Sequence, residues 1–188
     1  MNLLRVLFGR NGPPKAKLDA LFALSTAAIS LSTQLELKAG GKAGIAFRPA
    51  QASQFQEMKR ELEGLLALSV KETDSRYSIQ QDNYGYTWVV LEDEQLEDLV
   101  ATVHIVSTTV QEHGYDTLLL AAAFRFEDAG RPVYWIYNYK RGSFYPFVPL
   151  ENRRRDNPHE LRLKAVMESE LPIERNLEQW YALWDLPV

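Results

Sequence analysis

The sequence predicts an α+β fold, with an antiparallel sheet of about five or six strands and helices packed mainly on one face. Two observations lead to this prediction. Short runs of β-branched and aromatic residues come in pairs separated by turn residues, as in hairpins. Segments with apolar residues at helical spacing lie between and around these pairs. Strands grouped in hairpins, with helices between the groups, are typical of α+β domains.

The first long helix is expected over residues 17–32, with Asp19 in the first turn, where the helix dipole favours a negative charge. The second half of this segment is rich in Ser, Thr and Ala, so the helix should end or fray near Ala27. Glycines at 40, 41 and 44 predict a turn, and residues 43–48 a short strand closed by Pro49.

A second helix is expected after Ser53, because Ser53 and Gln56 have the spacing of a capping box. Its apolar face would carry residues that recur at helical spacing, namely Phe55, Met58, Leu62, Leu65, Leu66 and Ser69. Residues 76–80 and 84–91 then read as paired strands around a turn at Asp82-Asn83.

Residues 95–113 predict a long amphipathic helix that ends at Gly114. A meander of three strands follows, over 117–126, 133–139 and 143–148, and Pro146 restricts the third strand to an edge or a bulge. A helix starting at Asn157-Pro158 should turn three apolar side chains inward, namely Leu161, Val166 and Met167. A short helix over 177–184 would place Trp180 and Trp184 on one face.

The domain organisation follows from length and from the N-terminal pattern. The 188 residues suggest a single α+β domain over 15–188, preceded by a short amphipathic segment over 1–14 that Pro13 and Pro14 end. This segment either docks on the core or forms a weak peripheral membrane contact through its apolar residues Leu3, Leu4, Leu7 and Phe8. No apolar run reaches the roughly 18 residues of a transmembrane segment.

Composition excludes several classes of function. A net charge of -4 argues against a general nucleic-acid binder. The chain contains no cysteine, which removes disulfides, thiolate nucleophiles and cysteine-ligated metals, and fits a cytoplasmic protein, either free or peripheral at the inner face of the membrane. We therefore expect no nucleic-acid partner.

No pattern of residues predicts a catalytic or metal site. His104 and His113 lie nine residues apart on one predicted helix and so face opposite sides, and nucleotide-binding and hydrolase motifs are absent. The acidic run at 92–98 is typical of a solvated helix start. We predict no catalytic residue, no metal and no cofactor, although carboxylates and arginines from distant segments can still converge in a fold.

Two segments combine charge with aromatic rings. The first, YNYKRGSFYPFVPLENRRRDN over 137–157, is either a core strand followed by a solvated loop or a docking site for an anion or an acidic partner. Arginine binds carboxylates and phosphates bidentately and stacks on aromatic rings. Its candidate binding residues are Tyr137, Tyr139, Lys140, Arg141, Phe144, Tyr145, Arg154 and Arg155.

The second segment, DNYGYTW over 82–88, has a glycine between two tyrosines, which suggests a bulge or a close approach of the backbone. It is either a turn that enters a core strand or a second aromatic site. Its candidate residues are Asp82, Tyr84, Tyr86 and Trp88.

Several stretches resemble the PspA-associated protein family PspAB, among them LDALFALSTAAISL, DNYGYTW, YNYKRGSFYPFVPL, RRDN and LKAVMESELPIE. The resemblance covers nearly the whole chain. It implies association with PspA, a coiled-coil membrane-stress protein of the phage-shock response. It carries no catalytic residue or cofactor over to this chain.

Three hypotheses about function follow. The favoured one is a non-enzymatic adaptor or regulatory protein of the membrane-stress response, which docks an acidic PspA-like coiled-coil partner through the candidate residues of 137–157. The alternative is a binding protein or enzyme for a small anionic ligand at the same site, with Tyr86 and Trp88 lining it. The third is binding to anionic lipid through the N-terminal segment together with the basic residues.

Overall fold

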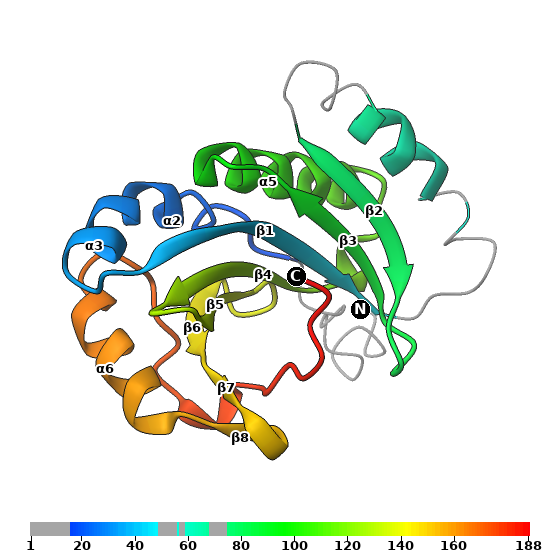
Figure 1. The fold of residues 1–188 in the computed structure, drawn as a ribbon. Helices are drawn as coiled ribbons and strands as arrows, with labels where there is room; N and C mark the ends of the chain where they lie inside the picture. The colour runs from blue at the N-terminus through cyan, green and yellow to red at the C-terminus, as the bar shows by residue number, and fades with distance from the viewer. Residues whose placement is uncertain (1–15, 49–55, 57–58, 68–74) are drawn as a thin grey trace, which may run out of the picture.

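The computed structural model describes residues 16–48, 56, 59–67 and 75–188 (Figure 1). The predicted N-terminal segment over 1–14 lies outside the described residues. The same is true of the predicted cap at Ser53 and of Phe55, Met58 and Ser69.

The fold is α+β, as predicted, and is built on a six-stranded sheet in the order β2-β3-β1-β4-β5-β6. Every neighbouring pair in this sheet is antiparallel. The strands are β1 (Lys38–Phe47), β2 (Arg76–Gln81), β3 (Thr87–Glu92), β4 (Leu119–Asp128), β5 (Arg131–Asn138) and β6 (Ser143–Phe147). A separate two-stranded ribbon pairs β7 (Pro149–Leu150) with β8 (Arg154–Arg155).

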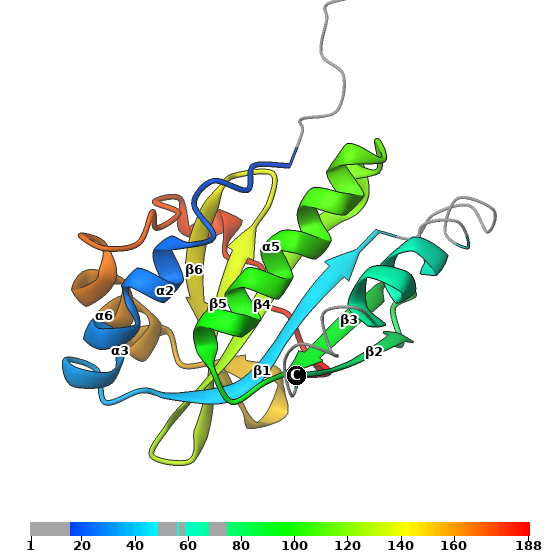
Figure 2. The same cartoon turned by 90° about the horizontal axis from the view of Figure 1, so that it is seen from above.

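The helices are α2 (Ala23–Thr26), α3 (Ala28–Thr33), α5 (Leu96–Glu112) and α6 (Asn157–Met167), and residues 59–67 are also helical. Short 3-10 turns occur at η1 (Asp116–Leu118), η2 (Glu151–Arg153) and η3 (Leu177–Gln179). The helix expected over 17–32 begins only at Ala23, so Asp19 lies before its first turn, and it is interrupted at Ala27, near the predicted end, but continues as α3 to Thr33. In Figure 2, α5 runs across the sheet beside α2 and α3.

The sheet is curved, and each of its faces carries a separate core. The helices pack on one face, which we call the helix face, against buried residues that include Val103, Phe124 and Trp135. On the other, concave face, residues 171–188, which we call the C-terminal segment, cover Trp88, Tyr145 and Phe147 (Figure 1). Because both faces are covered, β3 reads as five consecutive buried residues instead of alternating.

Four local predictions were wrong in detail. The helix expected over 177–184 is a 3-10 turn followed by irregular chain, because Trp180 and Trp184 pack separately on Tyr145 and Phe147, with ring centroids 6.0 and 5.2 Å apart. In α6, Leu163 and Met167 are buried, whereas the predicted Leu161 is 45% exposed.

The other two concern strands β1 and β3. β1 begins at Lys38, and the glycines predicted to form a turn instead form a register shift between Ala39 and Ala43, with Gly41 at a φ of 66°. β3 begins at Thr87 instead of residue 84, because the Asp82 turn holds the residues before it.

β6 is an edge strand, as Pro146 predicted. Its outer side is covered by the C-terminal segment, where the backbone N–H of Phe144 donates to Pro172 O at 2.8 Å and the N–H of Glu174 donates to Phe144 O at 2.8 Å. A missing N–H and a covering segment both protect a sheet edge from unwanted pairing.

Candidate functional site: a cavity on the concave face

The aromatic residues predicted to form a docking surface lie mostly in the core. Tyr137, Tyr139 and Phe144 are fully buried on the helix face. The hydroxyl of Tyr137 donates to Lys17 O at 2.9 Å, and that of Tyr139 lies 2.6 Å from Ser107 Oγ on α5. Burial raises the pKa of Tyr137 to about 12 and also raises that of Tyr139. Of the four predicted rings, only that of Tyr145 faces the concave side.

Two of the predicted arginines hold the fold together. Arg141 donates Nε to Glu174 Oε2 at 2.6 Å and Nη2 to Glu174 Oε1 at 3.0 Å. Arg155 pairs with the buried carboxylate of Glu160 at 2.9 Å, donates to Trp180 O, and lies 5.1 Å above the ring of Phe147. Both side chains therefore join the C-terminal half of the chain to the sheet.

The other two predicted cations, Lys140 and Arg154, are exposed. Neither forms an ion pair with any residue that the structure describes. Arg154 donates to Glu151 O at 3.5 Å, beside the two-stranded ribbon. These two side chains are the ones from the predicted set that remain available to an anion.

The turn before β3 is organised by Asp82. Its Oδ1 accepts the backbone N–H groups of Tyr84 and Tyr86, each at 2.9 Å, and its Oδ2 accepts Trp88 Nε1 at 2.9 Å. Gly85, with a φ of 84°, supplies the left-handed conformation that the turn needs. Tyr84 and Tyr86 are exposed at 51% and 39%, while Trp88 is buried against the sheet.

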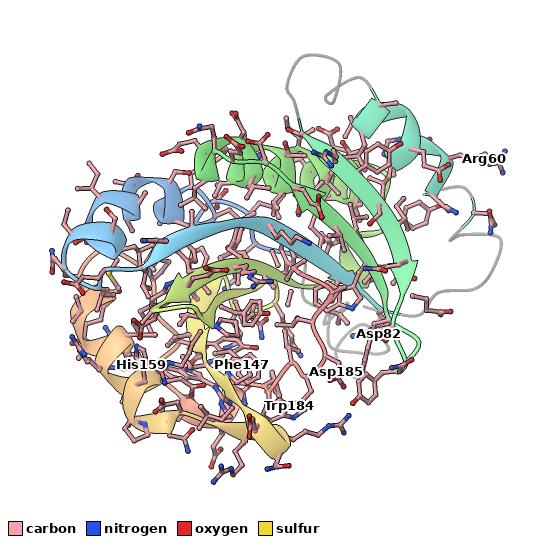
Figure 3. The ribbon with its side chains drawn as sticks, viewed as in Figure 1. Arg60, Asp82, Phe147, His159, Trp184 and Asp185 are labelled. Carbon is pink, nitrogen blue, oxygen red and sulfur yellow. The ribbon has the colours of Figure 1, made fainter. Side chains whose placement is uncertain are left out.

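A cavity of about 740 Å³ joins the two segments that the sequence singled out. Asp82, Tyr84, Tyr86 and Trp88 line one part of it, and Lys140 and Tyr145 another. Its remaining lining residues come from β1, β4 and β5 and their ends, η1, η2, the C-terminal segment and the stretch before α2, and are Ala16, Ala46, Arg48, Asp116, Thr117, Leu119, Leu120, Ala121, Asn138, Arg153, Tyr181, Ala182, Leu183 and Trp184. Figure 3 shows Asp82 and Trp184 on the concave side of the sheet.

The floor of the cavity is a row of paired residues that crosses four strands. Trp88 of β3 lies opposite Ala46 of β1, Ala46 lies opposite Ala121 of β4, and Ala121 lies opposite Asn138 of β5. The two alanines leave a trough between Trp88 and Asn138, because their side chains are the shortest in the row. The C-terminal segment, from Tyr181 to Trp184, forms the opposite wall.

Some charged side chains around the cavity are held by hydrogen bonds or ion pairs, and others are not. Asp82 is saturated by its three N–H donors, and Arg153 pairs with Asp185 at 3.0 Å. Arg48 and Lys140 are exposed, so they lie where the cavity meets solvent, and neither has an ion-pair partner in the described part of the chain. Asp116 is the remaining carboxylate of the lining, and its Oδ2 is buried without a hydrogen-bond partner in the same part of the chain.

Comparison with known proteins gives one result that decides the family. The model of the family "PspA associated protein B" matches residues 1–188, the whole chain. The chain belongs to the PspAB family. The resemblance seen in the sequence is thereby confirmed. No curated protein and no solved structure matches the chain.

Three parts of the site in this PspAB protein were not predicted. Arg48 and Asp116 lie in short stretches without a notable pattern, and residues 181–184 were expected in a helix. No local sequence pattern could indicate a shared site, because its charged residues Arg48, Asp116 and Lys140 are far apart along the chain. The pairing of β1 with β4, and of β4 with β5, brings these residues to one end of the sheet.

The histidines of the PspAB chain serve separate contacts. His104 packs on the ring of Phe22 at 4.6 Å, His113 Nε2 lies 2.6 Å from Glu61, and His159 Nε2 lies 3.5 Å from Asp128. Over the described ranges, no group of three or more His, Asp or Glu side chains could hold a metal ion. Over the same ranges, no helix has the length and apolar character needed to span a bilayer.

Proposed function

We propose that this PspAB protein is a non-enzymatic binding protein of the PspA system, and that the concave cavity receives a small ligand with a negatively charged group. Membership of the family suggests a role linked to PspA. The observation that carries the ligand proposal is the cavity itself, which joins the aromatic turn at Asp82–Trp88 to Lys140 and Tyr145. Cavities of 300–1,000 Å³ with a few placed polar groups are the usual small-molecule sites.

The electrostatics of the cavity support an anionic ligand. The two exposed cations, Arg48 and Lys140, outnumber the one carboxylate, Asp116, that no N–H donor or cation engages among the described residues. An anion that enters therefore meets a net positive charge without breaking an ion pair. The hydrogen bonds that saturate Asp82 give that carboxylate a structural role and support binding over proton transfer.

Phenyl phosphate tests this proposal by isothermal titration calorimetry. It combines a dianionic head with one apolar ring, and we expect measurable binding that Lys140→Glu abolishes. Lys38→Glu is the matched control, because Lys38 is exposed at the opposite end of β1 from Arg48, does not line the cavity, and should leave the titration unchanged. Absence of heat at millimolar phenyl phosphate, or equal binding by the Lys140→Glu variant, would overturn the proposal.

A second candidate function is direct docking of an acidic surface of PspA, as the sequence predicted for an adaptor. It is favoured by the exposure of Lys140 and Arg154 and by the absence of ion pairs to them within the described residues. Charge pairs at such a surface steer association and weaken with salt.

Calorimetry with purified PspA at low and moderate salt tests the docking. We expect salt-sensitive binding that the double variant Lys140→Glu/Arg154→Glu removes. Arg141 and Arg155 are unsuitable for this test, because changing them would disturb internal ion pairs. Binding that is unchanged in the double variant would reject these two cations as the docking site.

A further inference from the structure

We propose that the ligand of the concave cavity is a single-chain amphiphile with an anionic head. Its apolar chain lies in the trough over Ala46 and Ala121, and its head group lies at the Asn138 end, beside Lys140. This inference rests on the proposed ligand-binding function and specifies the chemical class of the ligand.

The shape of the trough favours an extended chain. Four residues in register, Trp88, Ala46, Ala121 and Asn138, line the cavity across β3, β1, β4 and β5. Neighbouring strands lie about 4.8 Å apart, so the row is about 14 Å long. A hydrocarbon chain of about twelve carbons has this length, since each C–C bond of about 1.5 Å advances an extended chain by about five-sixths of its own length.

The walls of the trough are apolar on both sides. Trp88, Ala46, Leu119 and Ala121 are buried at 4–8% exposure and form the sheet side. The C-terminal segment contributes Leu183 and Trp184 opposite them, and the Trp184 ring is itself fixed edge-on to Phe147 at 5.2 Å. Each CH₂ group that such surfaces remove from water adds to the affinity, so a longer chain binds more tightly.

Polar groups that can receive an anionic head lie at the Asn138 end of the row and at the end of β1. Asn138 ends the row on β5, Lys140 follows two residues later in the β5–β6 turn, and Arg48 directly follows β1, with its backbone N–H donating to Leu118 O at 2.7 Å. The side-chain Oδ1 of Asn138 already accepts the N–H of Arg141 at 3.2 Å, so its amide NH₂ remains as a donor. An anionic head at the Asn138 end meets Lys140 and the amide donor, while Arg48, two strands away at the end of β1, adds positive charge to the same cavity.

Neutral ligands and protein side chains fit less well. A neutral apolar ligand would use the trough but would leave Arg48 and Lys140 without a counter-charge. A single acidic side chain of a partner would meet the cations but fill a small part of 740 Å³. An amphiphile uses both features.

The test uses the full chain and n-dodecyl phosphate, titrated below its micellar concentration and followed by calorimetry. Phenyl phosphate has the same head without the chain, and dodecyltrimethylammonium has the same chain with the opposite charge. We expect dodecyl phosphate to bind at least tenfold more tightly than either. Ala121→Leu, which narrows the trough, should weaken dodecyl phosphate at least fivefold and leave phenyl phosphate within twofold.

A second readout locates the chain and does not depend on the Ala121→Leu variant folding. Of the four tryptophans, Trp88 and Trp184 line the cavity, whereas Trp135 and Trp180 are buried elsewhere. A bromine-labelled chain quenches tryptophans that it touches, and the bromine of 12-bromododecanoate would lie at the Trp88 end of the row, so this probe should quench the wild type and Trp88→Phe should remove a large part of that quenching.

The outcomes distinguish the amphiphile inference from the proposed anion-binding function on which it rests. If dodecyl phosphate binds no more tightly than phenyl phosphate, the cavity binds anions but the inference that its ligand carries a hydrocarbon chain is wrong. If dodecyltrimethylammonium binds as tightly as dodecyl phosphate, the anionic head is wrong. If no anionic probe binds, both proposals are wrong.

Discussion

Arg141 in the β5–β6 turn and Glu174 in the C-terminal segment form a bidentate ion pair, with N–O distances of 2.6 and 3.0 Å. Glu174 also accepts Trp180 Nε1 at its backbone O, at 2.9 Å, and donates its N–H to Phe144 O at 2.8 Å. One residue therefore attaches the C-terminal segment to the edge strand β6. The same segment forms the wall of the cavity, so this pair connects stability with the binding site.

Glu174→Gln should lower the free energy of unfolding at pH 7 by about 2 kcal/mol, the size of hydrogen bonds to a charged group. The guanidinium of Arg141 holds the pKa of Glu174 below its ordinary value of 4.5. The resulting stabilisation is present above pH 4.5 and is lost as the pH falls through the lowered pKa. The deficit of the variant should therefore shrink between pH 5 and pH 3 in urea unfolding.

Glu168→Gln is the matched control, because it removes the same charge from an exposed helical pair with Lys164 at 2.6 Å. Exposed pairs of this kind contribute little, so its unfolding curve at pH 7 should follow that of the wild type. A Glu174→Gln deficit that stays constant from pH 7 to pH 3 would contradict the role given to the Arg141 pair.

Two neighbouring arginines should differ sharply in how much they contribute to the stability of the fold. Arg155→Ala leaves the carboxylate of Glu160, which is 2% exposed, buried without its cation, and should cost about 3–5 kcal/mol in unfolding free energy. Arg154→Ala removes an exposed side chain and should leave stability nearly unchanged. Chemical denaturation of both variants provides the comparison.

The pH dependence of Arg155→Ala is a separate check. Burial already raises the pKa of Glu160, and Arg155 opposes that rise. Without Arg155 the pKa should rise further. Since a raised carboxyl pKa favours the protonated folded state, the variant should lose stability as the pH rises above 4.5. Equal deficits at pH 4 and pH 7 would show that Glu160 is not the group left uncompensated.

The hydrogen bond between Ser107 of α5 and Tyr139, which directly follows β5, should cost a different amount of stability depending on which partner is changed. Ser107 Oγ donates to Val103 O at 2.6 Å, so the fully buried hydroxyl of Tyr139 donates to Ser107 Oγ. Ser107→Ala leaves that hydroxyl without an acceptor and should cost about 1–3 kcal/mol. Tyr139→Phe leaves Ser107 bonded to Val103 and should cost less than about 1 kcal/mol. Equal costs in thermal unfolding would refute this hydrogen-bond direction.

Asp116→Asn should strengthen the binding of anions to the cavity. It removes the one lining carboxylate that lacks a cation or N–H donor among the described residues. Removing this like charge near the head group should make the binding free energy more favourable by about 1 kcal/mol, which corresponds to an increase in affinity of roughly fivefold. Phenyl phosphate titrations of the variant and the wild type measure this. An unchanged or weaker affinity would place the bound anion away from Asp116.

Gly44→Ala should loosen the end of the C-terminal segment. A Cβ at this position would lie 2.8 Å from Val188 Cγ1, closer than real contacts allow, and 3.1 Å from the ring of Trp88, which is also tight. The segment can move more easily than β1 can, so residues 181–188 should be cleaved faster in limited proteolysis. Gly64→Ala is the control, since a Cβ there meets no atom within 4 Å and its cleavage rate should not rise.

Much of the architecture could be predicted from local patterns. The β4–β5–β6 meander, α5 and the edge position of β6 follow from hairpin turns, helical periodicity and Pro146, which act within a few residues of one another. The interruption of the first helix near Ala27 was also predicted, but its continuation over Ala28–Thr33, where Leu31 is buried, was not.

The C-terminal segment shows where local patterns mislead. Trp180 and Trp184 have helical spacing, yet Trp180 stacks on Tyr145 and Trp184 packs on Phe147, on two different residues of one strand. The burial of these two rings on the sheet outweighs the helix that residues 177–184 would form alone. Sequence spacing contains no information about the strand that receives the rings.

The sequence by itself determined the elements and which segments combine aromatic rings with charge. Tertiary structure decided how those residues are used. It placed Tyr137, Tyr139 and Phe144 in the core, paired Arg141 and Arg155 with carboxylates, and left Lys140 and Arg48 exposed at the lining of one cavity. The physical reason is that strand register sends alternate side chains to opposite faces, and that ion pairs form between residues distant in the chain.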